Sequence, residues 1–104
     1  MTDPKAIERH IICVVHAAPG HASRVGKLLL DLVGPARDEP GCLYYDIYRD
    51  DRPDQFVILD GWTSDDALAE HAVHSNVTRV VEELTPLLAR PLEHVRSRRM
   101  SEPA

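Results

Sequence analysis

A proline-glycine turn that runs directly into an alternating strand is the feature that most constrains how this chain can fold. Glu39-Pro40-Gly41 ends any preceding helix, and residues 42–49 then alternate as a strand does. A polar stretch, Asp50 to Gln55, leads to a second apolar segment that ends at Trp62, the only tryptophan. Two such segments joined by a polar turn predict a β-hairpin, on which the other elements must pack.

The hairpin side chains are predicted to divide between two faces, because successive side chains of a strand point in opposite directions. On the first strand one face would hold Leu43, Tyr45 and Ile47, and the other Cys42, Tyr44, Asp46 and Tyr48. On the second strand Ile58, Asp60 and Trp62 share a face. The pattern leaves open whether Tyr44, Tyr48, Ile58 and Trp62 lie under helices or on the uncovered face.

The flanking segments predict two helical regions and two further strands. A β-branched strand, 10–16, precedes the Pro19-Gly20 turn and a helix whose apolar stripe runs from Val25 to Val33, weakened at Gly34-Pro35. After the hairpin, a helix is predicted to begin at residues 63–66 and to be interrupted and capped again at Ser75-Asn76. The last strand is predicted over residues 92–98. The order β-α-β-β-α-β predicts one α+β, ferredoxin-like domain over 1–104 with an antiparallel four-stranded sheet. We expect its core at about 9–98, with flexible tails.

Charge and composition exclude several classes of function. The net charge of −5 argues against nucleic acid, whose phosphates require a basic face. No apolar segment reaches the roughly 20 residues of a membrane helix, and the first nine residues lack the apolar region of a signal peptide. Two cysteines, Cys13 and Cys42, do not make a disulfide framework. These features predict a cytoplasmic protein with no nucleic-acid or membrane partner.

Four short motifs together resemble the antibiotic biosynthesis monooxygenase (ABM) family over roughly His10 to Val95. They are Pro19-Gly20, the segment 39–45 (EPGCLYY), the segment 56–62 (FVILDGW), and Ala67-Leu68 followed by His71. The resemblance implies a dimeric α+β barrel, in which two ferredoxin-like sheets pack face to face and each subunit keeps a pocket between its sheet and its helices. The apolar, uncovered sheet face expected here would likewise require a partner, most simply a second copy.

The resemblance implies several chemistries. Some members are cofactor-free oxygenases that convert hydroquinone- or anthrone-like aromatics into quinones, some degrade haem, and one branch isomerises a small phosphorylated signal. The aromatic oxygenases pair an asparagine with a tryptophan four residues later, and here Ile58 stands at that distance before Trp62. The haem degraders carry a strand asparagine where this chain has Cys13; Trp62 and, approximately, His71 match their tryptophan and helix histidine.

His71 and Trp62 are the predicted catalytic residues. His71 lies on the inward stripe of a helix, where packing alone would favour alanine or leucine, and an imidazole can take a phenolic proton near neutral pH. The alternative is a buried histidine bonded to a backbone carbonyl or to a carboxylate such as Asp60. Trp62 would stack on an aromatic substrate or donate a hydrogen bond to its oxygen, or would simply fill the core.

The predicted function is a cofactor-independent monooxygenase that uses dioxygen to oxidise an electron-rich aromatic to a quinone, acting as a homodimer. Its predicted substrate-binding residues are Tyr45, Cys13, Asp60 and Ile58. No metal is expected, because His71 and His74 lack a third ligand at a diagnostic spacing. Two alternatives stay open: a haem-degrading monooxygenase with His71 or His74 on the iron, and a non-catalytic dimeric module that binds a small molecule.

Overall fold

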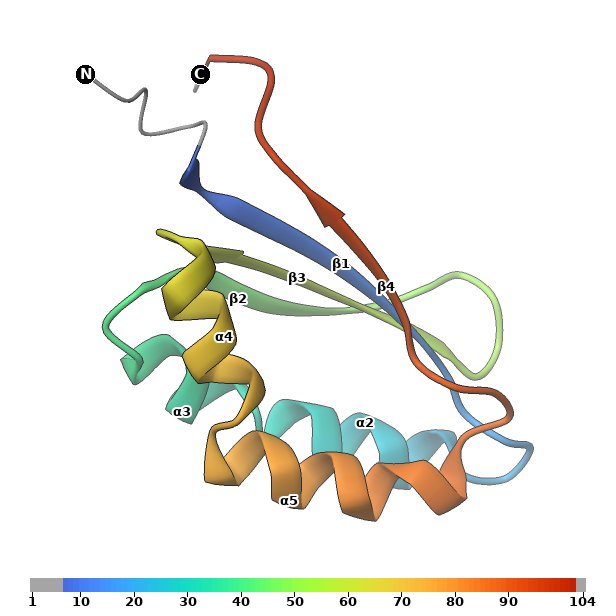
Figure 1. Cartoon of the computed structure of the whole chain (residues 1–104). Coiled ribbons are helices and arrows are strands. Elements are labelled where there is room, and N and C mark those ends of the chain that lie inside the picture. The colour runs from blue at the N-terminus through green and yellow to red at the C-terminus, as the bar shows by residue number, and fades with distance from the viewer. Residues whose placement is uncertain (1–6, 103–104) are drawn as a thin grey trace.

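A computed structural model describes residues 7–102 as a four-stranded sheet with helices on one face (Figure 1). The elements in chain order are β1 (Arg9–His16), α2 (Ala22–Leu30), α3 (Val33–Asp38), β2 (Cys42–Arg49), β3 (Gln55–Trp62), α4 (Asp65–Ala72), α5 (Ser75–Leu84), the 3-10 helix η1 (Thr85–Leu87) and β4 (Glu93–Ser97). The predicted order of strands and helical regions is confirmed. The predicted tails fall in part on residues 1–6 and 103–104, which lie outside the described residues.

The strands pair in the order β2-β3-β1-β4, and every pair is antiparallel. The two central strands are therefore the first strand and the second strand of the predicted hairpin, as a ferredoxin-like fold requires. Helices α2 and α5 lie side by side under this sheet, and α4 lies closer to one end (Figure 1). The predicted α+β class is confirmed. None of the helices within residues 7–102 is long and apolar enough to cross a bilayer.

The core forms because the apolar stripes of the helices match the alternating inner face of the sheet. Val25, Leu28 and Leu29 of α2 are almost fully buried, in one cluster with Val15 of β1 and Phe56 of β3. Complete burial of a side chain of this size contributes about 1.5–3 kcal/mol relative to leaving it exposed. The cluster fixes the distance between the helix layer and the sheet.

The first helical region divides earlier than its glycine and proline predict. The chain turns at Asp31-Leu32, and α3 begins at Val33, so Pro35 lies in the first turn of a new helix. Amide groups in a first turn have no partner within the helix, so the missing N–H of proline costs nothing there. Helix α3 ends at Asp38, and its C-cap Glu39 is extended (φ −68°, ψ 135°) because it precedes a proline.

A β-bulge at the start of β2 corrects the predicted division of its faces. Cys42 pairs with Trp62 and Tyr44 with Gly61, so Leu43 is an extra residue without a partner on β3. As a result Cys42 packs on the core and Leu43 is 45% exposed, the reverse of strict alternation. Tyr45 and Ile47, beyond the bulge, share a face as predicted, and the structure shows that this face points inward.

The structure also settles which face carries the helices. Ile58 and Trp62 point toward the helices and are buried, whereas Tyr44 and Tyr48 lie on the opposite side. That opposite side is apolar and open: Ile12 is 40% exposed and Val95 is 53% exposed.

Candidate active site

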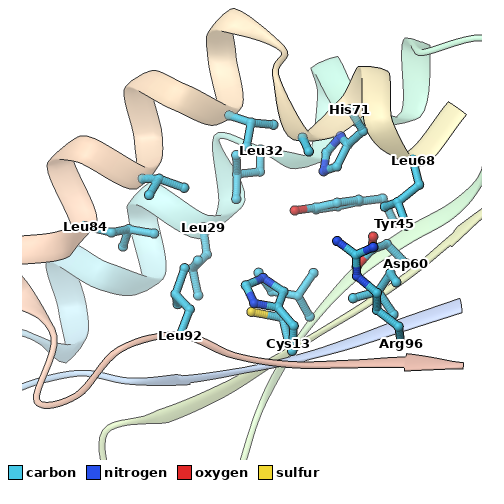
Figure 2. Close-up of a pocket in the computed structure, with 16 residues that line it drawn as sticks. Cys13, Leu29, Leu32, Tyr45, Asp60, Leu68, His71, Leu84, Leu92 and Arg96 are labelled. Carbon is cyan, nitrogen blue, oxygen red and sulfur yellow. The ribbon is translucent and has the colours of Figure 1, made fainter. Parts of the chain in front are cut away.

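A cavity of about 380 Å³ lies between the inner face of the sheet and the helices (Figure 2). Its wall is mostly aliphatic, made by Ile11, Leu29, Leu32, Ile58, Leu68, Ala72, Val77, Val81, Leu84 and Leu92. The groups that can hydrogen-bond or titrate are Cys13, Tyr45, Asp60, His71, His94 and Arg96. Small-molecule pockets span roughly 300–1,000 Å³, so this volume suits a compact ligand of a few rings.

Five of the six residues predicted for the site line this single cavity. Cys13 comes from β1, Tyr45 from β2, Ile58 and Asp60 from β3, and His71 from α4. The sheet register explains the first four, because Cys13 pairs with Ile58 and Tyr45 pairs with Asp60, and paired residues share a face. Trp62, the sixth, is absent from the lining and lies behind it.

His71 is held by a carboxylate that sequence reasoning did not connect with it. Glu39 Oε2 lies 2.7 Å from His71 Nδ1, and the two side chains are only 12% and 10% exposed. Ser64 accepts from the Ala67 amide at 3.1 Å and starts α4, which places His71 in its last turn. An ionised carboxylate only accepts hydrogen bonds, so in a pair with ionised Glu39 the Nδ1 atom would be the donor and Nε2 would be the nitrogen that can accept a proton. The predicted alternative partner, Asp60, is not the one observed.

Trp62 supports this histidine instead of contacting the cavity. Its ring is fully buried and stacks on the imidazole of His71, with centroids 4.3 Å apart and planes 28° from parallel. Its indole N–H donates to Asp60 Oδ2 at 2.6 Å. The structure matches the alternative in which Trp62 fills the core and its indole N–H finds a partner, since Trp62 does not line the cavity and its donor is bonded to Asp60.

Tyr45 and Asp60 give the cavity two groups whose titration is shifted by burial. Figure 2 shows the Tyr45 hydroxyl pointing into the cavity below His71, and the two ring centroids are 5.6 Å apart. Burial, followed by the nearby Asp60 charge, raises the pKa of Tyr45, so its hydroxyl stays protonated and can donate. Burial also raises the pKa of Asp60, while the hydrogen bond from Trp62 opposes the rise.

Cys13 is an inert part of the wall. Burial, with a smaller contribution from Asp60, raises the pKa of its thiol to about 12, so it does not form a thiolate at neutral pH. His74, which was considered with His71 as a metal ligand, instead accepts a hydrogen bond from the Asn76 amide at 3.2 Å and caps α5. Within residues 7–102 no group of three or more histidine, cysteine or acidic side chains could hold a metal.

Three lining or supporting residues were missed by sequence reasoning. Glu39 was interpreted only as part of a turn, and its partner is 32 residues away, which no local pattern reveals. His94 and Arg96 of β4 line the cavity beside Leu92. The spacing of Leu92, His94 and Arg96, two residues apart along the chain, was a usable signal, because it predicts that these three side chains share one face of the last strand.

Comparisons with known proteins show the family and the fold of this chain. The profile of the family described as antibiotic biosynthesis monooxygenase matches residues 9–83. The chain is similar to the crystal structure of PA3566 from Pseudomonas aeruginosa, at 30% identity and a TM-score of 0.85, covering 91% of this chain and 96% of that one. It is also similar to Rv0793 from Mycobacterium tuberculosis, at 25% identity and a TM-score of 0.89, covering 93% and 99%. A curated relative, the uncharacterised protein sll1783 from Synechocystis, is 36% identical over 62 residues, 59% of this chain and 42% of that protein's length.

Proposed function

The chain belongs to the antibiotic biosynthesis monooxygenase family, and from that premise we propose that it is a cofactor-independent monooxygenase of electron-rich aromatics. The substrate class is a hydroquinone- or anthrone-type compound, and the oxidant is dioxygen. The observation that carries the proposal is the Glu39–His71 pair, buried behind an apolar cavity of a size that suits a few fused rings. Such a pair can remove a proton at a site with little water.

In the first step His71 Nε2 accepts the phenolic proton of the substrate. The imidazolium that forms is stabilised by Glu39 through the 2.7 Å contact at Nδ1, and Trp62 keeps the ring in place by stacking. The product of this step is a phenolate whose negative charge is delocalised onto a ring carbon. The Tyr45 hydroxyl, held neutral by its raised pKa, can donate to the developing oxyanion.

The second step uses dioxygen as the electron acceptor. The substrate anion transfers one electron to dioxygen, and the resulting substrate radical and superoxide combine to form a carbon–peroxide bond. After protonation of the distal oxygen, the O–O bond breaks and the ring carbon loses its hydrogen. One oxygen atom remains as the quinone carbonyl, and the other leaves as water. All electrons come from the substrate, so neither a metal nor a haem is required, and the aliphatic wall limits side reactions with water.

The apolar outer face supports a homodimer as part of the proposal. Val95, Ile12 and Leu59 are register partners on adjacent strands, so they form one continuous row across the sheet. An exposed apolar surface of this kind marks an interaction site. An Ile12→Glu variant should therefore sediment as a monomer while the wild type sediments as a dimer. Leu30→Glu, on an exposed position of α2, is the matched control and should remain dimeric.

The test is oxygen uptake by purified, metal-free protein with a panel of hydroquinones and anthrones, with quinone formation followed by absorbance. His71→Ala should lower the rate by about 10²–10⁴-fold, the usual contribution of a general base. His21→Ala, an exposed histidine outside the cavity, is the control. Activity that appears only after haem is added, together with a Soret shift, would support the haem-degrading alternative. An unchanged rate in folded His71→Ala would contradict the assignment of the base.

A further inference from the structure

The last strand gives the cavity a cationic rim that the proposed chemistry does not use. His94 pairs with Cys13 and Arg96 pairs with Ile11, so both side chains lie on the inner face of the sheet and line the cavity. Figure 2 shows the guanidinium of Arg96 reaching to the side of the cavity at which Tyr45 and Asp60 lie. Among the described lining residues, Arg96 is the one permanent positive charge.

Within residues 7–102, Arg96 of β4 lacks the carboxylate partner that Arg9 of β1 and Arg37 of α3 have. Arg9 contacts Asp65 at 2.6 Å and Arg37 contacts Asp46 at 3.0 Å. Arg49 of β2 likewise has no carboxylate partner among these residues, but its guanidinium lies over the Phe56 ring, 5.5 Å from the centroid. No hydrogen bond or ion pair joins Arg96 to any described residue. A ligand that fills the cavity would displace water from this guanidinium, which is costly unless the ligand supplies an acceptor. A carboxylate fits best, because it takes two parallel hydrogen bonds from a guanidinium.

We propose that the cavity selects an aromatic acid, with the rings against the aliphatic wall and a ring carboxylate bound by Arg96 at the β4 rim. His94, two residues away on the same face, is placed to add a second hydrogen bond. This inference rests on the proposed function in assigning the cavity to a phenolic substrate, and it adds the charge that such a substrate carries.

Asp60 is the competing partner for Arg96. It lies on the strand beyond β1, at the residue that pairs with Ile11, which in turn pairs with Arg96. However, Asp60 Oδ2 is bonded to the Trp62 indole, and no ion pair joins Asp60 to Arg96 in the described residues. Burial of Asp60 favours its neutral form, which reduces its repulsion of an anionic ligand. Loss of Arg96 would weaken anion binding whether Arg96 binds the ligand carboxylate or only neutralises Asp60, so the experiment must distinguish these two roles.

The experiment is a calorimetric titration with 2,5-dihydroxybenzoate and with its methyl ester, a neutral ligand of similar shape. The wild type should bind the acid about tenfold or more tightly than the ester at low ionic strength, as expected for a charge-assisted bidentate contact. The preference should weaken as salt is added, because the rim is open to solvent. Equal affinity for the two ligands, or no binding of either, would overturn the proposal.

Variants then assign the preference to one residue. Arg96→Met should abolish the preference by lowering the affinity for the acid to that for the ester. Arg90→Met, which removes the same charge from an exposed arginine outside the cavity, should keep the preference. The double variant Asp60→Asn with Arg96→Met is decisive. If Arg96 binds the carboxylate, the double variant still lacks the preference. If the preference returns, Arg96 serves only to compensate Asp60, and the proposal is wrong.

Binding is measured without turnover, so this proposal and the proposed function can fail separately. A preference for the acid that depends on Arg96, with no oxygen uptake for any aromatic, would support the anion site and contradict the oxygenase. Oxygen uptake with no preference for the acid would support the oxygenase and contradict the anion site.

Discussion

The Glu39→Gln substitution is the sharpest perturbation of the proposed site. It replaces a carboxylate by an amide of nearly the same shape, and the amide oxygen can still accept from His71 Nδ1. The 2.7 Å contact and the tautomer are therefore kept, and only the negative charge is lost. Since the two side chains are about nine-tenths buried, water cannot replace that charge effectively.

The expected size of the effect follows from what the charge does during the reaction. His71 becomes an imidazolium when it takes the substrate proton, and a hydrogen bond to a charged group contributes about 1.5–3 kcal/mol. The neutral hydrogen bond that the glutamine keeps contributes about 0.5–1.5 kcal/mol, so the substitution loses about 1–1.5 kcal/mol. If most of that difference is realised as the proton moves, kcat falls by about five- to 13-fold. The Michaelis constant should change little, because Glu39 does not line the cavity and does not touch the substrate.

The assay is steady-state oxygen uptake with the best aromatic substrate of the panel. Imidazole ¹⁵N spectra would check that Nδ1 stays protonated in the variant. Glu83→Gln, which removes an exposed carboxylate paired with Arg79, is the matched control and should keep the wild-type rate. A wild-type kcat in a folded Glu39→Gln protein with an unchanged tautomer would refute the argument that the carboxylate stabilises the charged imidazole.

Three further predictions concern the fold and the titration of buried groups. Gly41→Ala should lower the free energy of unfolding by about 1–3 kcal/mol in urea, because the new Cβ would overlap the Cβ of Ala67 on α4. Asp60→Asn should raise the melting temperature at pH 7, and the gain should vanish as the pH falls below the ordinary carboxyl pKa of 3.8. The reason is that the folded state raises the pKa of Asp60, so its contribution is most favourable at low pH and is lost as the pH rises through the folded pKa. Iodoacetamide at pH 8 should label Cys42 before Cys13, whose pKa of about 12 leaves about one thiolate in ten thousand.

Each of these has a simple check. Gly34→Ala, with open space at its Cβ, should not destabilise the protein, and equal unfolding energies for the two alanine variants would contradict the packing argument. A melting temperature of Asp60→Asn that matches the wild type at pH 7 and pH 3 would show that burial of this carboxyl costs nothing. Mass mapping that finds Cys13 alkylated first would contradict its place in the wall.

Much of the fold was predictable because it depends on local patterns. The β-branched segment of β1, the period-two alternation of β3 and the helical stripe that includes Val25, Leu28 and Leu29 are the patterns that the core requires. The bulge at Leu43 was not predictable, since the unpaired residue is defined only by how β2 meets β3. The break at Asp31-Leu32 carries no proline or glycine, so only packing shows where α2 ends.

The candidate site was predicted in part for the same reason. Ile58 and Asp60 share a face by alternation, and His71 was noticed because a polar side chain stood in an apolar stripe. Its partner Glu39 was missed, and the sequence left open whether Trp62 contacts a ligand or fills the core. Both points depend on contacts between separate elements, which have no fixed spacing along the chain.

By itself the sequence determined the order of the elements, which residues of β3 share a face and the presence of a titratable group, His71, among apolar positions. These follow from backbone geometry and burial, which act over a few residues at a time. Only the tertiary structure decided which face the helices cover, that Glu39 rather than Asp60 holds His71, and that Arg96 lines the cavity with no hydrogen-bond or ion-pair partner within residues 7–102. Those facts depend on how layers pack across the chain, where distance in space is independent of distance in sequence.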